Sequence, residues 1–313
     1  LNNKLNLLED RYSSLAEEYN DSDDTVIAAQ SGGSEFYSSA LGRYVSMLVY
    51  RADGDVDGAR IDAEAFSRAF RTQPTVYDFP QPDIDPLLKN SAGTRINVLA
   101  FAGRIPEKRA SVFFIRTFED RVLILVQKEN NKGILETTEV ESFGWPGMTE
   151  GYQFTFELPF LRSIPSRVER VELVVDGLPA GDLDLIENLG NVSAEVYRAK
   201  EAIIYVKTIT RTILKGLLNQ ELKSGVTGEN ALLGTILGFF TDIAVHASEE
   251  ADLRSARYYP SLAFAGEFSI DPGRRSAALN YYDASDNLIF SEEIGENDYR
   301  GDGLNLMYAY VPW

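Results

Sequence analysis

The chain has 313 residues, with 48 acidic side chains against 30 basic ones, and it contains no cysteine. A net charge of −18 repels the phosphate backbone of nucleic acids and anionic lipid head groups, so nucleic acid is not expected as a partner. The lack of cysteine excludes disulfides, thiolate metal sites and cysteine nucleophiles within this sequence, and the length predicts two domains at roughly 150 residues each.

Residues 1–74 are predicted to form a small helical domain. A first amphipathic helix is indicated by apolar residues with a spacing of three or four: Leu5, Leu8, Tyr12, Leu15 and Tyr19. Two further helices are expected at 35–51 and 56–71, the second ending before Pro74. The segment 75–93 contains several prolines, which cannot continue a helix, so it is predicted to be a linker.

From residue 94 to 178 the pattern changes to short runs rich in β-branched and aromatic residues. We expect strands at 95–102, 111–118, 122–127, 152–160 and 167–175. The segment 152–156 alternates apolar and polar residues, which indicates a strand with one face buried and the other exposed to solvent. The sheet is therefore predicted to be antiparallel.

Helices are expected to return over 183–248. The apolar stripe of the first, 189–222, is wider than a coiled-coil seam, which favours a helix packed across a sheet. The second ends near Ser248 and includes an apolar run of about 15 residues interrupted by Asp242, whereas a membrane span needs roughly 20. We therefore expect a buried helix and no transmembrane segment.

The tail, 261–311, is predicted to be strands again. The runs 262–270, 276–282, 288–294 and 304–311 are separated by tight turns containing Asp, Gly, Pro and Asn, and this regular spacing predicts a meander. The fold class is thus α+β, with a small helical domain followed by an antiparallel strand-rich domain that contains a long helix pair.

The segment from Asp53 to Glu64 supports two incompatible interpretations. It places carboxylates at Asp53, Asp55 and Asp57, glycine at the sixth position and glutamate at the twelfth, which is the pattern of a calcium loop with Glu64 closing on the ion. Arg60, however, occupies a position that is normally apolar, and no second loop exists for pairing. Calcium is therefore the one cofactor that the sequence leaves open.

The rival interpretation is a helix pair that turns at residues 54 and 55 and resembles a tetratricopeptide hairpin. Small and apolar residues on the facing sides would let the helices approach closely. The groove around Tyr44, Leu48, Ala59 and Phe66 is then the candidate partner surface, with core packing of the same side chains as the alternative.

Catalytic signatures such as a nucleophile elbow, a phosphate loop or a dinucleotide fingerprint are missing, and His246 is the only histidine. We therefore expect a protein that is not an enzyme. A carbohydrate-active enzyme with two carboxylates ranks third, because no pair stands out among the 48 acidic residues.

Several segments occur in an order that resembles an uncharacterised bacterial family of exported lipoproteins with an N-terminal tetratricopeptide-like hairpin. They are Gly103-Arg-Ile-Pro-Glu-Lys108, residues 152–173, the helix after Asp182-Leu-Asp-Leu-Ile186, and Glu250-Ala-Asp-Leu-Arg-Ser255 with Pro260 downstream. The resemblance covers about 36–311. It implies a protein of the cell envelope, in the periplasm or at the outer membrane, whose precursor carries a signal peptide and a lipid anchor, and it supplies no catalytic residues.

The function expected from these observations is a non-enzymatic envelope interaction or assembly protein that binds other proteins or itself. A homo-oligomer is compatible with this expectation. The runner-up is a calcium-dependent surface protein that uses the loop from Asp53 to Glu64.

Overall fold

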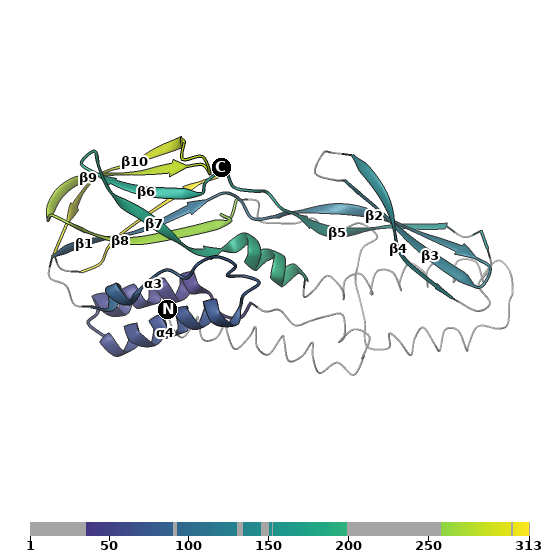
Figure 1. The fold of residues 1–313 in the computed structure, drawn as a ribbon, viewed down its shortest axis with the longest axis horizontal. Coiled ribbons are helices and arrows are strands. Elements are labelled where there is room, and N and C mark those ends of the chain that lie inside the picture. Colours follow the sequence, from purple (N-terminus) through teal and green to yellow (C-terminus); the bar gives the residue numbers. More distant parts are fainter. Residues whose placement is uncertain are drawn as a thin grey trace.

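The computed structural model of the protein describes residues 36–89, 93–129, 134–144, 150–151, 153–198, 258–301 and 303–312. These residues form an α+β fold with a helical hairpin, a seven-stranded sheet and a four-stranded sheet (Figure 1). The helix predicted at residues 5–19, the helical pair beyond residue 198, the apolar run before Ser248 and His246 lie outside the described residues.

The hairpin consists of α3 (Ala40–Ala52) and α4 (Val56–Thr72), so both helices predicted here are confirmed. The first helix begins later than expected because Ser39 is its N-cap and accepts a hydrogen bond from the Gly42 amide. Asp55 caps α4 in the same way through the Gly58 amide. Gly54 lies between the helices with φ 78°, a left-handed conformation that glycine adopts without steric cost.

The segment predicted to be a linker lies against the hairpin. Val76, Tyr77 and Ile84 are buried in the same apolar cluster as the hairpin side chains, and a 3-10 helix, η1, spans Asp85–Leu88. Prolines prevent a long helix here, as the sequence predicted, but the chain between them supplies core residues.

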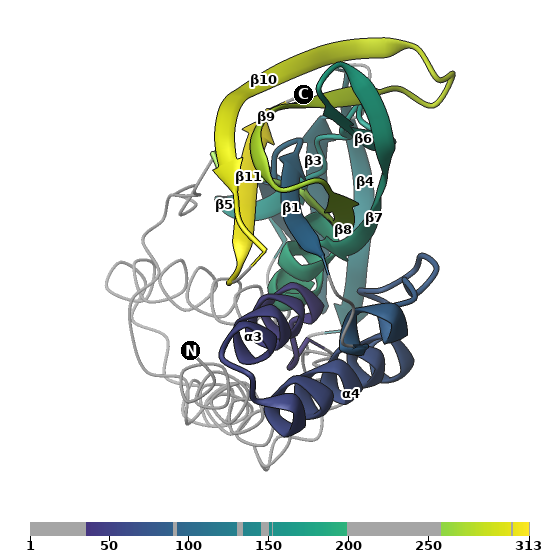
Figure 2. The same cartoon turned by 90° about the vertical axis from the view of Figure 1, so that its left-hand side faces the viewer.

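The larger sheet contains seven strands in the order β10-β9-β6-β7-β8-β1-β11. Their bounds are β1 Thr94–Ala102, β6 Arg170–Val175, β7 Leu178–Asn188, β8 Leu262–Ile270, β9 Gly273–Tyr282, β10 Leu288–Tyr299 and β11 Asn305–Val311. All pairs are antiparallel except β1 with β11, which run parallel. The sheet curls until β10 contacts β1 and β11, so it is nearly closed (Figure 2).

Two predictions for this sheet are wrong. The tail is not a meander, because β8 pairs with β1 and β7 while β9 pairs with β6 and β10. The helical region does not begin at residue 183, since β7 continues to Asn188 and residues 189–198 are the described helical part. Long-range pairing decides both outcomes, and a local pattern does not contain it.

The smaller sheet has the order β4-β3-β2-β5, with every pair antiparallel, and lies on the right in Figure 1. Its strands are β2 Glu107–Phe118, β3 Arg121–Glu129, β4 Leu135–Gly144 and β5 Gln153–Arg162. The sequence did not predict β4, whose residues are mostly polar. Because β2 follows β1 and β5 precedes β6, this sheet is an insertion between two strands of the larger one.

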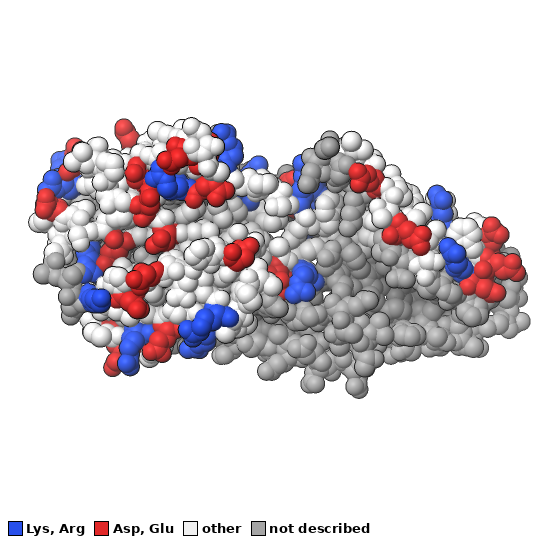
Figure 3. All heavy atoms as spheres, viewed as in Figure 1, with Lys and Arg blue, Asp and Glu red and all other residues white. Residues whose placement is uncertain are grey.

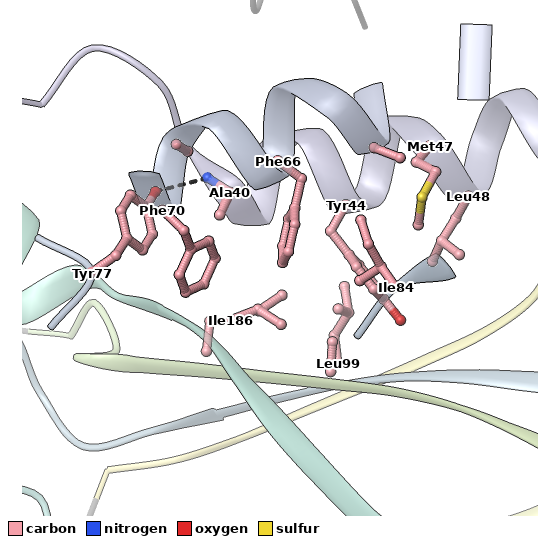
Figure 4. Packing of buried hydrophobic residues seen from close by; sticks show 14 of the residues in the cluster. Ala40, Tyr44, Met47, Leu48, Phe66, Phe70, Tyr77, Ile84, Leu99 and Ile186 are labelled. Carbon is pink, nitrogen blue, oxygen red and sulfur yellow. Dashed lines mark hydrogen bonds between the residues drawn. The ribbon is translucent and has the colours of Figure 1, made fainter. Parts of the chain in front are cut away.

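Alternation along β1 divides the large sheet between two cores. Ile96, Val98 and Ala100 point into the cluster enclosed by the curled sheet, whereas Leu99 joins the cluster beneath the hairpin. Ile186 of β7 lies with Leu99 against the hairpin, as Figure 4 shows. The hairpin thus covers the outer face of β7, β8 and β1.

Candidate functional site

The first turn of α3 is fixed to the sheet by one buried carboxylate, Glu187 of β7. Its Oε2 accepts hydrogen bonds from Ser39 Oγ and the Leu41 amide, both at 2.8 Å, and from the Tyr77 hydroxyl at 3.3 Å. Burial raises the pKa of the Glu187 carboxyl, while these donors oppose the rise. The carboxylate satisfies an amide at the helix N-terminus that has no partner within the helix.

Tyr77, in the segment after α4, also contacts the first turn of α3. Its hydroxyl accepts a hydrogen bond of 2.8 Å from the Ala40 amide, drawn as the dashed line in Figure 4. Burial is the main cause that raises the pKa of this phenol, so Tyr77 stays a neutral hydrogen-bonding group.

The other end of α3 is held by a charged cluster. Arg51 binds Glu267 of β8 with both terminal nitrogens, at 2.7 and 3.2 Å, and Arg95 of β1 binds the same carboxylate at 2.5 Å. The Glu267 side chain is 6% exposed, against 20% for Arg51 and 15% for Arg95. Two guanidinium groups share one carboxylate, so the cluster carries one net positive charge.

This cluster lines a pocket of about 420 Å³ between the α3–α4 turn, the segment before β1 and the turn before β11. Its charged lining residues are Arg51, Arg60, Lys89 and Arg95 on the basic side and Glu267 on the acidic side. The apolar part of the wall includes Leu88 and Leu304. The volume is within the range of small-molecule sites, which is roughly 300–1,000 Å³.

Asn97 adds an unusual feature to the pocket wall. It stands opposite Glu267 in the β1–β8 register and is 4% exposed. Its Oδ1 atom is buried and has no hydrogen-bond partner. With almost no accessible surface, this oxygen lies within the protein and does not face the open pocket.

The four residues predicted to form a partner surface are buried. The exposed fractions of Tyr44, Leu48, Ala59 and Phe66 lie between 0% and 3%, and all four belong to one apolar cluster with residues of the sheet. Figure 4 shows Tyr44, Leu48 and Phe66 in this cluster. The burial favours core packing, which the sequence left open as the alternative to a partner surface.

The four carboxylates of the calcium interpretation do not gather round one point. Asp53, Asp55, Asp57 and Glu64 are all exposed, and Asp55 is occupied as the cap of α4. Because α4 begins at Val56, Glu64 lies roughly 12 Å further along the helix axis. Within the described ranges, no three His, Cys, Asp or Glu side chains form a group that could hold a metal. Calcium binding stays a prediction of the sequence alone, which this arrangement of side chains does not support.

An exposed apolar row on β11, the last strand, was not predicted. Leu306, Tyr308 and Tyr310 are 40%, 74% and 36% exposed, while the alternate residues Met307, Ala309 and Val311 are buried. The alternation is visible in the sequence, but both sets are apolar, so the pattern alone does not show which set faces solvent.

A second pocket of about 420 Å³ lies near the junction of the two sheets, and among its described lining residues Glu169 is the only acidic one. Among the described lining residues of the first pocket, the one carboxylate is Glu267, which two arginines bind. The carboxylate pair of a glycoside hydrolase stays a prediction.

The segments that suggested a family of exported lipoproteins are partly described. Residues 103–106 connect β1 to β2, and residues 182–186 belong to β7, directly before the helical segment 189–198. The segment 250–255 lies outside the described residues. Comparisons of the chain with family models, curated proteins and solved structures gave no match.

Proposed function

We propose that the protein is a non-enzymatic interaction protein of the bacterial cell envelope, which binds another protein or a second copy of itself through the exposed side of β11. The observation that carries the proposal is the row of Leu306, Tyr308 and Tyr310. Tyrosine is enriched at protein interfaces because its ring buries a large apolar area and its hydroxyl can still form a hydrogen bond.

The position of this row supports the proposal. The strand β11 stands at one end of the sheet order, and among the described strands only β1 forms hydrogen bonds with it. An edge strand can pair its backbone with a strand from a partner, while alternate side chains determine which partner fits. Where Figure 3 shows described residues, acidic and basic side chains are intermingled.

We further propose that the α3–α4 hairpin is a single tetratricopeptide-like unit. Ala59 is 1% exposed and lies in the shared core, and the turn at Gly54 reverses the chain over a few residues. A lone unit cannot stack on neighbouring repeats, so it buries its apolar face against the sheet. Its role in this proposal is structural.

The envelope location rests on the family resemblance. None of the described helices has the length and apolarity needed to cross a bilayer. Fractionation of the bacterium that makes the protein tests the location: recovery with the periplasm or the outer membrane is expected, and recovery only with the cytoplasm would contradict it.

Site-specific crosslinking tests the interaction, because the sequence has no cysteine that would compete for a thiol-reactive probe. Tyr308→Cys, labelled with a benzophenone maleimide and irradiated in an envelope extract, is expected to give a discrete crosslinked species. Ser291→Cys on the opposite edge strand β10 is the matched control, since Ser291 is also exposed.

The mass of the crosslinked species distinguishes a second copy from another protein. Equal labelling patterns for Tyr308→Cys and Ser291→Cys, or no discrete product from Tyr308→Cys, would contradict the proposed binding side.

A further inference from the structure

We infer that the pocket between the α3–α4 turn and the sheet binds a small amphipathic anion. Its carboxylate or phosphate group is held by Lys89 with the Arg51 and Arg95 pair, and its apolar part lies against Leu88 and Leu304. This inference goes beyond the proposed protein interaction and uses none of the exposed residues of β11.

The first argument is charge. The chain has a net charge of −18, yet among the described residues four basic side chains and one acidic side chain line this pocket. A concave site with low-dielectric walls concentrates the field of its own lining charges. The pocket therefore attracts anions although the protein as a whole repels them.

The second argument is preorganisation. Glu267 holds the Arg51 and Arg95 guanidinium groups next to each other, and Arg95 also donates to the Lys89 carbonyl at 3.4 Å. Each guanidinium has five N–H donors, so donors remain after these contacts. The Lys89 ammonium forms no ion pair with any described residue. An oxyanion can bind without first ordering the arginines.

The third argument is the apolar part of the wall. Leu88 and Leu304 line the same pocket as the basic side chains. The wall thus offers a positive site and an apolar surface side by side, which matches an anion with an apolar substituent better than a bare inorganic ion.

Isothermal titration of the full chain at low ionic strength tests the inference, with hexyl phosphate, hexanoate and inorganic phosphate as probes. We expect one saturable site for hexyl phosphate or hexanoate, and the tighter of the two identifies the anionic group. Inorganic phosphate should bind at least roughly tenfold more weakly, because it lacks the apolar part.

Lys89→Gln is the decisive variant, because Lys89 is exposed and its side chain supports no described contact. Loss of one charge-assisted contact should weaken binding by roughly tenfold or more. Lys108→Gln on β2, with the same change of charge, is the control and should bind like the unmodified protein.

Three results would overturn the inference. They are the absence of saturable binding for both organic probes, equal affinity for inorganic phosphate, and equal loss in Lys89→Gln and Lys108→Gln. The last result would show a general charge effect and no specific site.

Discussion

The two faces of the seven-stranded sheet are stabilised in different ways. The inner face encloses an apolar cluster built by alternation, and no buried charged residue is described within it. The outer face, under the hairpin, combines an apolar cluster with Glu187 at one end of α3 and Glu267 at the other. The hydrophobic effect is not directional, so burial of apolar area does not select one orientation of the hairpin. These carboxylates, in contrast, accept hydrogen bonds only from particular donors. We conclude that apolar burial holds the hairpin on the sheet and that the polar contacts fix its position.

The largest effects on the free energy of unfolding should come from removing a large side chain from either core. Phe66→Ala beneath the hairpin should reduce the free energy of unfolding by about 3–5 kcal/mol, and Leu279→Ala in the inner cluster by about 2–5 kcal/mol. Both side chains are 0% exposed. Urea unfolding followed by circular dichroism measures the two changes.

The shape of these unfolding transitions shows whether the hairpin and the sheet unfold together. If hairpin and sheet form one unit, Phe66→Ala shifts a single transition that includes the strands. A separate early transition of the helices in that variant would contradict a shared unit.

A smaller effect is expected at the charged cluster. Glu267→Ala leaves Arg51 and Arg95 next to each other without their carboxylate, so the free energy of unfolding should fall by about 2–3 kcal/mol. Glu293→Ala on β10 removes an exposed carboxylate and should change it by less than about 0.5 kcal/mol. Equal values for the two variants would show that the cluster does not help to hold the hairpin.

Glu187 should make stability depend on pH. Burial raises the pKa of its carboxyl above the ordinary 4.5, so the folded protein keeps a proton that the unfolded chain has already lost. The stability contribution of this group is present below pH 4.5 and is lost as pH rises through the raised pKa.

Glu187→Gln keeps an acceptor oxygen for Ser39 and Leu41 but cannot ionise. The free energy of unfolding of the variant, relative to the unmodified protein, is therefore expected to increase with pH above 4.5. Urea unfolding at a series of pH values measures this difference, and a difference that does not change with pH would contradict the account.

The smallest effect is expected from calcium. Because α4 begins at Val56, the carboxylates of Asp53, Asp57 and Glu64 do not surround a common point. Titration calorimetry with calcium should therefore give no saturable signal that depends on Glu64. Glu64→Ala is the matched variant. Saturable binding that disappears in this variant would show that the turn rearranges round an ion.

The sequence predicted local structure better than pairing. The helix expected at 56–71 is observed as Val56–Thr72, and the strand expected at 262–270 is β8, because both patterns depend on nearby residues. The parallel pairing of β1 with β11 joins segments about 200 residues apart, so no local pattern indicates it. The meander was predicted incorrectly for a related reason, because β8 and β9 pair with strands that are distant in the sequence, β1 and β6.

The candidate site was predicted only in part. The turn after α3 was recognised as informative, and Gly54, Ala59 and Arg60 do line the pocket. The importance of Glu187 and Glu267 could not be recognised among 48 acidic residues, since the low exposure of their side chains and not residue type distinguishes them. The register shift between Leu185 and Glu187, which accompanies this placement, is likewise a property of strand pairing.

Amide hydrogen exchange measured by mass spectrometry over a range of urea concentrations tests most directly whether hairpin and sheet are one unit with the pocket at their seam. We predict that amides in the middle of α3, α4, β1 and β8 open with the same free energy and the same dependence on urea. Hairpin amides that open at a clearly lower free energy than those of β1 and β8 would show that the hairpin detaches by itself, and would contradict the account.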